Sequence, residues 1–221
     1  MAKKKLVEGD IFYVKVNSKY IFARLLLDVD SRILKHEPEH NCKFFSGCYL
    51  IEVYKGIYET PNLTSKEIIL PSQYTFKKYF YSKNYNVEWT FHEHEPVEYY
   101  KLDFPETLET GDKGLINFRK FDVSLPTKIV CEDFPKNKGN GNQKYTGTIC
   151  SSFYQMVDES FHLQDRDDLM KSDRTYFLDN NDIRLNNNFR KEIYDQIGED
   201  MNQSYYEMAL KHGYDLGRFY Q

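Results

Sequence analysis

The sequence predicts an α+β protein, with an N-terminal curved antiparallel β-sheet or small barrel followed by a helical C-terminal region. Residues 1–135 contain many short segments in which polar and apolar residues alternate, the pattern of β-strands. The run Lys-Asn-Lys-Gly-Asn-Gly-Asn at 136–142 is small, polar and turn-prone. After it, apolar residues recur at helical spacing. We therefore expect a β-rich domain over 1–135, a linker over 136–144 and a helical, acidic region over 145–221.

The strands begin with a hairpin. Residues 10–16 alternate, and the turn-forming residues 17–19 lead into a second strand over 20–27. The polar stretch 28–46 is typical of a long loop. Short antiparallel strands at this spacing favour a small barrel or a strongly bent sheet. Further strands are expected over 48–55, 67–70, 87–92, 97–101, 114–121 and 128–131, with a short helix or irregular aromatic segment over 73–81.

One long amphipathic helix is expected near the C-terminus. Its apolar stripe has spacings of four, four, four, four and three residues. Asn187 or Asn188 is suited to cap its start and Gly213 to end it, and Glu207 and Lys211 form a favourable i,i+4 pair. A weaker helix is expected over 152–163. The residues of the stripe are Phe189, Ile193, Ile197, Met201, Tyr205 and Met208.

Composition indicates a soluble, cytoplasmic protein. No stretch approaches the roughly 18 apolar residues that a membrane helix needs. Glu8 and Asp10 interrupt the basic N-terminus before the apolar core of a signal peptide could form. The four cysteines form no Cys-x-x-Cys pair, so we expect reduced thiols. A disulfide joining Cys42 to Cys48, or Cys131 to Cys150, stays open as an alternative.

The negative charge is concentrated in the second part of the chain. Residues 139–221 carry 9 Lys and Arg against 14 Asp and Glu, whereas residues 1–138 carry 21 against 20. At a pI of about 5.9 the chain lacks the concentrated basic face of most nucleic-acid-binding proteins, so nucleic acid is not an expected partner. The acidic part of the chain instead predicts a negative surface.

No motif predicts an enzyme, a metal site or a cofactor. His92 and His94 would share one face of a strand, but a metal would need a third ligand from elsewhere, and we interpret them as a polar strand end. Asp165, Asp167 and Asp168 could be imagined as a hydrolase pair or a magnesium site, but their crowding is typical of a solvated loop or helix end. We expect no catalytic residue.

The aromatic content is high, with 19 Tyr and 16 Phe. Some of these rings must reach the surface, where tyrosine is enriched at the centres of protein interfaces. The alternative is that tyrosines simply follow the strands, which favour them. Composition alone leaves both open.

Several segments resemble one known family. The run Glu-Gly-Asp-Ile-Phe-Tyr-Val at 8–14, followed by Tyr-Ile-Phe-Ala-Arg-Leu-Leu at 20–26, is similar to the opening hairpin of the immunity protein 26 family. The strand at 50–54, the lone Trp89 and the Glu-Pro-Val run at 95–97 continue the likeness, which covers roughly residues 5–127. The resemblance implies a mostly β fold and the neutralisation of a cognate secreted toxin, often a nuclease, inside the producing cell or its kin. It carries over no contact residues.

Two hypotheses follow. In the first, the chain is an immunity protein whose acidic region meets a basic toxin. The contact residues that we predict for it are Asp165, Asp167, Asp168, Glu192, Asp195 and Glu199. In the second, it is a small-barrel module that binds nucleic acid or peptide through Tyr74, Phe76, Lys77 and Lys78.

Overall fold

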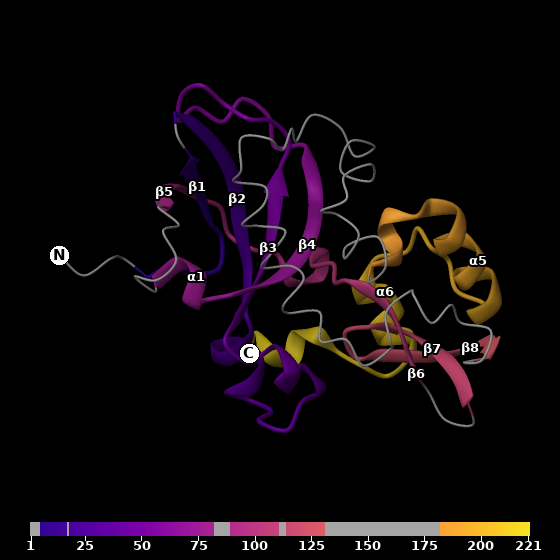
Figure 1. Cartoon of the computed structure of the whole chain (residues 1–221). Helices are drawn as coiled ribbons and strands as arrows, with labels where there is room; N and C mark the ends of the chain where they lie inside the picture. Colours follow the sequence, from indigo (N-terminus) through magenta and orange to yellow (C-terminus); the bar gives the residue numbers. More distant parts are fainter. Residues whose placement is uncertain (1–4, 17, 82–88, 111–113, 131–181) are drawn as a thin grey trace.

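The computed structural model describes residues 5–16, 18–81, 89–110, 114–130 and 182–221, which contain two antiparallel sheets (Figure 1). The first sheet has five strands in the order β4-β3-β2-β1-β5, and the second has three in the order β6-β7-β8. The α+β class with antiparallel strands is therefore confirmed. The first sheet comprises β1 (Asp10–Val16), β2 (Lys19–Asp28), β3 (Cys48–Tyr54), β4 (Ile68–Phe76) and β5 (Trp89–His94). The second comprises β6 (Glu106–Thr110), β7 (Leu115–Lys120) and β8 (Val123–Val130).

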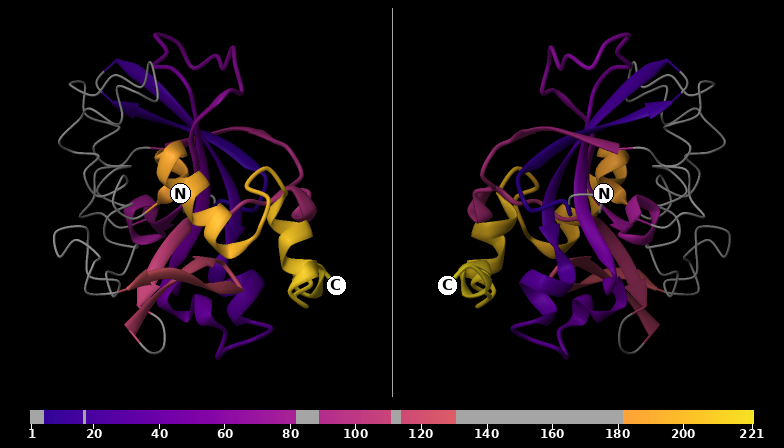
Figure 2. Two further views of the ribbon diagram at one scale, coloured as in Figure 1. Left: turned by 90° about the vertical axis from the view of Figure 1, so that its right-hand side faces the viewer. Right: turned by 90° about the vertical axis from the view of Figure 1, so that its left-hand side faces the viewer.

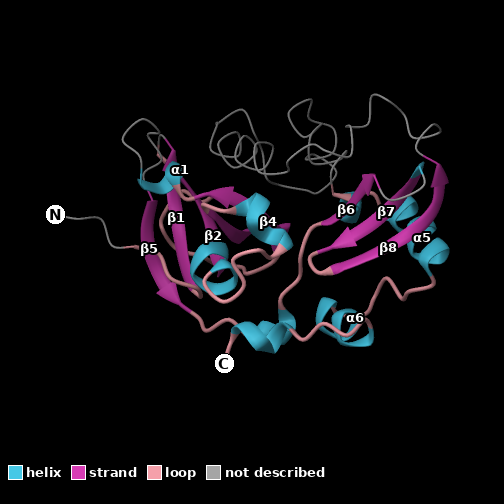
Figure 3. Ribbon diagram, turned by 90° about the horizontal axis from the view of Figure 1, so that it is seen from below, coloured by secondary structure: helices cyan, strands magenta, loops and turns pink. Residues whose placement is uncertain are grey.

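Short helices connect the strands, and the C-terminal segment is helical. Figure 3 shows helices of this segment lying below and between the two sheets. The connecting helices are η1 (Val29–Leu34), η2 (Asn41–Phe45), α1 (Lys78–Tyr81) and η3 (Tyr99–Lys101). The C-terminal helices are η6 (Ile183–Leu185), α5 (Asn187–Ile197), α6 (Tyr205–Lys211) and η7 (Leu216–Phe219).

Both sheets and the C-terminal helices share one hydrophobic core. Leu25 and Leu50 of the first sheet, Phe118 of the second, Met208 of α6 and Phe219 of η7 all have no exposed surface and belong to it. A smaller cluster, centred on Phe22, lies on the other face of the first sheet. Burial at about 25 cal/mol per Å² makes this shared core the main force that fixes the C-terminal segment against the sheets.

The Glu8-Gly9-Asp10 run, which begins the resemblance, is a junction between strands. Gly9 has a φ of 93°, and a Cβ there would lie 2.5 Å from the carbonyl oxygen of Glu95. Glu8 accepts hydrogen bonds from the Arg32 guanidinium and from the backbone N–H of Asp28. Asp10 pairs with His94. In this structure the run holds β1, β2 and β5 together.

Several strand predictions need correction. The stretch 28–46 contains η1 and η2 rather than a loop alone. Strand β4 extends to Phe76, through half of the predicted aromatic segment, and residues 99–101 form a short helix instead of a strand. Strand β6 was not predicted. Among the described strands both sheets are open, so a closed barrel is not formed there.

The prediction of a single long C-terminal helix is also wrong. Gly198 ends α5 in the left-handed conformation, with a φ of 73°. Ser204 then starts α6 with a capping box, in which the Ser204 hydroxyl accepts from the Glu207 backbone N–H and the Glu207 carboxylate accepts from the Ser204 backbone N–H. Asn186, rather than either of the next two asparagines, caps α5, and Lys211 pairs with Glu199 instead of Glu207.

The remaining predictions are tested only in part. Gly213 follows the end of α6 with a φ of 83°, as expected. Cys42 and Cys48 are free and buried, so they form no disulfide with each other. The linker 136–144, the helix 152–163, Cys131 and Cys150 lie outside the described residues, and the domain boundary stays a prediction. Within the described segments no helix is long and apolar enough to span a bilayer.

Candidate protein-binding surface

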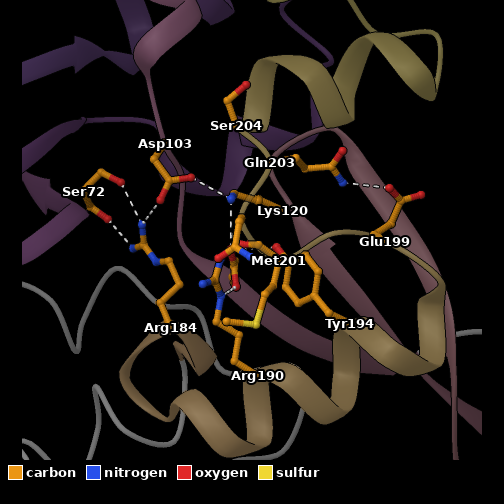
Figure 4. A network of polar contacts seen from close by, with 12 residues as sticks. Ser72, Asp103, Lys120, Arg184, Arg190, Tyr194, Glu199, Met201, Gln203 and Ser204 are labelled. Carbon is orange, nitrogen blue, oxygen red and sulfur yellow. Dashed lines mark hydrogen bonds and ion pairs between the residues drawn. The ribbon is translucent and has the colours of Figure 1, made fainter.

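A buried ion network attaches the C-terminal helices to the second sheet (Figure 4). Glu106 of β6 has no exposed surface and is its centre. Its carboxylate accepts hydrogen bonds from Lys120 Nζ at 2.9 Å, from the Arg190 guanidinium at 2.6 and 2.7 Å and from the Tyr194 hydroxyl at 2.8 Å. Lys120 comes from β7, whereas Arg190 and Tyr194 come from α5. One carboxylate therefore fixes α5 on the sheet.

A second arginine extends this network to the first sheet. The Arg184 guanidinium donates to Asp182, to Asp103 and to the backbone oxygen of Ser72 in β4. Asp182 in turn accepts from the side chain of Gln73. The segment before α5 is thus joined to both sheets by charge-assisted hydrogen bonds, which are about twice as strong as neutral ones.

The network holds its acidic groups in the charged form. Burial alone would raise the pKa of Asp103, but the positive charges of Arg184 and Lys120 outweigh it and lower the pKa. Burial would likewise raise the pKa of Glu106, and hydrogen bonds from Arg190 together with the charge of Lys120 lower it. The buried carboxylates stay ionised because each meets cations at hydrogen-bonding distance.

The C-terminal residues are anchored in the same way. Arg218 pairs with Glu37 at 2.8 Å and with Asp122 at 3.1 Å. Asp122 also lies 2.6 Å from His40 Nε2. Phe219 has no exposed surface, and its ring packs edge-on against His40. The chain end is therefore part of the fold and positions the helices before it.

These internal contacts leave the C-terminal segment with a negative outer side. Within residues 182–221, described without a gap, four of the five cations pair with carboxylates: Arg184, Arg190, Lys211 and Arg218. Five carboxylates of the segment are exposed, Glu192, Asp195, Asp200, Glu207 and Asp215. In the left view of Figure 2 this segment, orange to yellow, lies in front of the strands. Lys191 and Lys211 are exposed as well, so five carboxylates stand against two lysines among the exposed charges of this segment and its surface is acidic on balance.

The six predicted contact residues differ in whether the structure describes them and in whether they are exposed. Glu192 and Asp195 are exposed on α5, on this acidic side. Glu199 is not available there, because its side chain is only 4% exposed and accepts from Lys211, His212 and Gln203. Asp165, Asp167 and Asp168 lie outside the described residues. The structure thus places two of the six predicted residues together on the surface.

A group of tyrosines missed by sequence reasoning is held together by ring contacts. The tyrosine cluster comprises Tyr99, Tyr100, Tyr206 and Tyr220, from η3, α6 and the residue after η7. The Tyr99 ring lies 5.7 Å from Tyr100, 5.7 Å from Tyr206 and 5.2 Å from Tyr220 between centroids. Desolvation raises the pKa of Tyr206, and the neighbouring Tyr99 and the carboxylate of Asp215 raise it further.

The sequence does contain a signal for these rings. Tyr99-Tyr100 and Tyr205-Tyr206 are doublets between charged or polar residues. In the second doublet Tyr205 is 1% exposed and packs in the core, while Tyr206 is partly exposed. A tyrosine doublet on a short helix points one ring inward and leaves the other near solvent.

The other candidate residues serve the fold. Tyr74 is 3% exposed and stacks on Phe45, and Lys77 is held between Asp28 and Asp30, so the patch of the second hypothesis is largely engaged. His92 packs on Phe22, whereas His94 pairs with Asp10 at 3.0 Å. The described residues contain no group of three or more His, Cys, Asp or Glu placed to hold a metal ion.

In comparisons with known proteins, no protein-family model, no curated protein and no solved structure matches this chain. Its function is therefore inferred from the surface itself and from the resemblance in the N-terminal segments.

Proposed function

We propose that the chain is an immunity protein that binds and neutralises a cognate bacterial toxin, such as a nuclease effector, in the cytoplasm of the producing cell. The observation that carries this proposal is the surface of residues 182–221, where five carboxylates and the ring of Tyr214 are exposed while Arg184 and Arg190 pair with carboxylates inside the fold. That combination suits a partner with a basic surface.

Charge supports the choice of partner. A nuclease needs a basic surface because its substrate carries a phosphate charge at every nucleotide. Exposed carboxylates such as Glu192 and Asp195 would attract that surface and speed the encounter, by as much as several powers of ten for strongly complementary pairs. Covering the same surface would exclude the nucleic acid.

The aromatic rings supply the second half of the interaction. Tyrosines bury a large apolar area at low conformational cost and dominate many interface centres. Within the tyrosine cluster the Tyr100 hydroxyl donates a hydrogen bond to the carboxylate of Glu98, so an anchoring ring and a negative charge are adjacent there. The N-terminal segments that resemble immunity proteins form the neighbouring strands β1, β2, β3 and β5, which also supports the proposal.

Co-expression with the protein encoded next to this chain tests the proposal. The expected result is that the neighbour's C-terminal domain stops growth alone, that this chain restores growth, and that the two proteins purify together. A neighbour that is neither captured nor made harmless would contradict the proposal.

Matched charge reversals locate the effect on the surface. The double variant Glu192→Lys with Asp195→Lys should weaken both growth rescue and capture. The control variant, Glu59→Lys with Glu67→Lys, makes the same change of charge in the exposed connection between β3 and β4 and should leave both nearly unchanged. Equal effects of the two variants would count against an interface on the C-terminal segment.

A further inference from the structure

The tyrosine cluster already contains a cation site that is occupied by the chain itself. The Tyr100 hydroxyl and the Lys101 ammonium both donate hydrogen bonds to the carboxylate of Glu98. Lys101 Nζ also lies 5.8 Å from the centroid of the Tyr100 ring. An ammonium group is therefore held between a carboxylate and an aromatic face, which is the geometry that binds cations in proteins.

This internal occupant is easily displaced. The side chain of Lys101 is 66% exposed and that of Glu98 is 45% exposed. Exposed ion pairs contribute little because water and salt compete for both charges. An incoming cation that also buries the Tyr100 ring would replace Lys101 at small cost, since Lys101 would move into solvent.

A second cation contacts another ring of the cluster. The Arg32 guanidinium lies 4.5 Å from the centroid of the Tyr220 ring, while Tyr99 stacks on Tyr220 at 5.2 Å. Contacts between rings thus lead from Tyr220, which already meets a cation of the chain, through Tyr99 to Tyr100 at 5.7 Å.

We propose that Tyr99, Tyr100 and Glu98 bind a Lys or Arg side chain of a basic protein partner, which displaces Lys101. The inference rests on the proposed function and specifies how its partner is recognised. The occupant is basic because the site's own contact to Lys101 is a contact to a cation.

An NMR titration with a tetra-arginine peptide tests this site without the toxin. The expected result is that shift changes centre on Tyr99 and Tyr100. Lys101→Met should raise the affinity about two- to fivefold, because it removes the competing cation. Glu98→Gln and Tyr100→Ala should each lower it by about two- to fivefold, because they remove the carboxylate and the ring.

A matched control is Lys43 of η2, which is not one of the residues of the proposed site. Lys43 forms an exposed ion pair with Glu39 at 3.0 Å, beside the exposed ring of Phe44. Lys43→Met changes the net charge as Lys101→Met does and should alter the peptide affinity far less. If both lysine variants raise the affinity equally, the effect is overall charge and the proposed site is wrong.

The possible failures are distinguishable. Peptide shifts that avoid the cluster, or a Lys101→Met variant that binds more weakly, would overturn this site even if co-expression still neutralises the toxin. A peptide that binds at the cluster, with the expected variant effects, supports the site. If the co-expressed toxin stays active despite that result, the proposed function fails while cation binding at the cluster stands.

Discussion

Replacing Glu106 by glutamine removes the charge at the centre of the buried network while keeping the size of the side chain. One carboxylate oxygen becomes an NH₂ group that faces donors from Lys120, Arg190 and Tyr194. Lys120 is 2% exposed, and of its two ionic partners among the described residues it keeps Asp103. The variant therefore leaves buried positive charge that nearby carboxylates neutralise only in part.

The expected cost follows from this burial. Breaking a buried, hydrogen-bonded ion pair typically lowers the free energy of unfolding by about 3–5 kcal/mol. Since whole domains have only about 5–15 kcal/mol, the variant should lose a large share of its stability. The control is Glu39→Gln, which removes an ion pair whose carboxylate is 86% exposed. That change should cost about 1 kcal/mol or less.

Urea unfolding followed by tryptophan fluorescence measures both variants. The chain has one tryptophan, Trp89, which is 7% exposed in the first sheet. Because both sheets share one core, damage at Glu106 should shift the transition that Trp89 reports. If Glu106→Gln costs no more than the surface control, the network does not stabilise the fold as argued.

Three further outcomes are expected. The cationic partners of Glu106 lower its pKa below the ordinary 4.5 although burial opposes this, so the stability that its charge contributes is present above pH 4.5 and is lost as the pH falls through the lowered pKa. Urea unfolding at decreasing pH should therefore show the stability of the wild type approaching that of Glu106→Gln, and a difference in stability that stays constant would contradict the assignment. Phe219→Ala should cost about 3–5 kcal/mol in thermal unfolding, because the ring is fully buried; an unchanged Tm would mean that the chain end is not anchored. Gly9→Ala should cost about 1–3 kcal/mol, since it combines a positive φ with a clash against Glu95, and a Tm equal to the wild type would refute the strand junction.

Local patterns predicted the first strands. Alternation gave β1 and β2, which follow one another closely along the chain. It also gave β3, although residues 29–47, with η1 and η2, separate this strand from its partner β2. The break between α5 and α6 was also present in the sequence, as Gly198 and the Ser204-x-x-Glu207 capping box, but the continuous apolar stripe outweighed it.

The network could not be predicted, because its partners are distant along the chain. Glu106 and Arg190 are separated by 84 residues, so nothing local shows that this glutamate is buried. Because the partners that neutralise Glu106 are so distant, the sequence of strand β6 looks too polar for a core strand. Charge counting correctly indicated an acidic C-terminal segment, but which carboxylates face outward depends on where its arginines pair.

Glu199 illustrates the limit for individual residues. In the sequence it is an acidic residue of the C-terminal region just as Glu192 is, yet the turn after Gly198 directs its side chain toward Lys211 and His212. Likewise the aromatic excess indicated surface rings without identifying them. Tyr100 and Tyr214 are 44% and 41% exposed, whereas Tyr49 and Tyr205 are buried.

The acidic surface of the C-terminal segment is best tested by the association rate with the neighbouring toxin domain, measured by stopped flow over a range of salt concentrations. We expect fast association that slows steeply with salt, and a rate about tenfold lower with weaker salt dependence for Glu192→Lys with Asp195→Lys. The Glu59→Lys with Glu67→Lys control should keep most of the wild-type rate. An association rate that is insensitive to salt and equal in both variants would contradict the acidic, partner-binding side of the molecule.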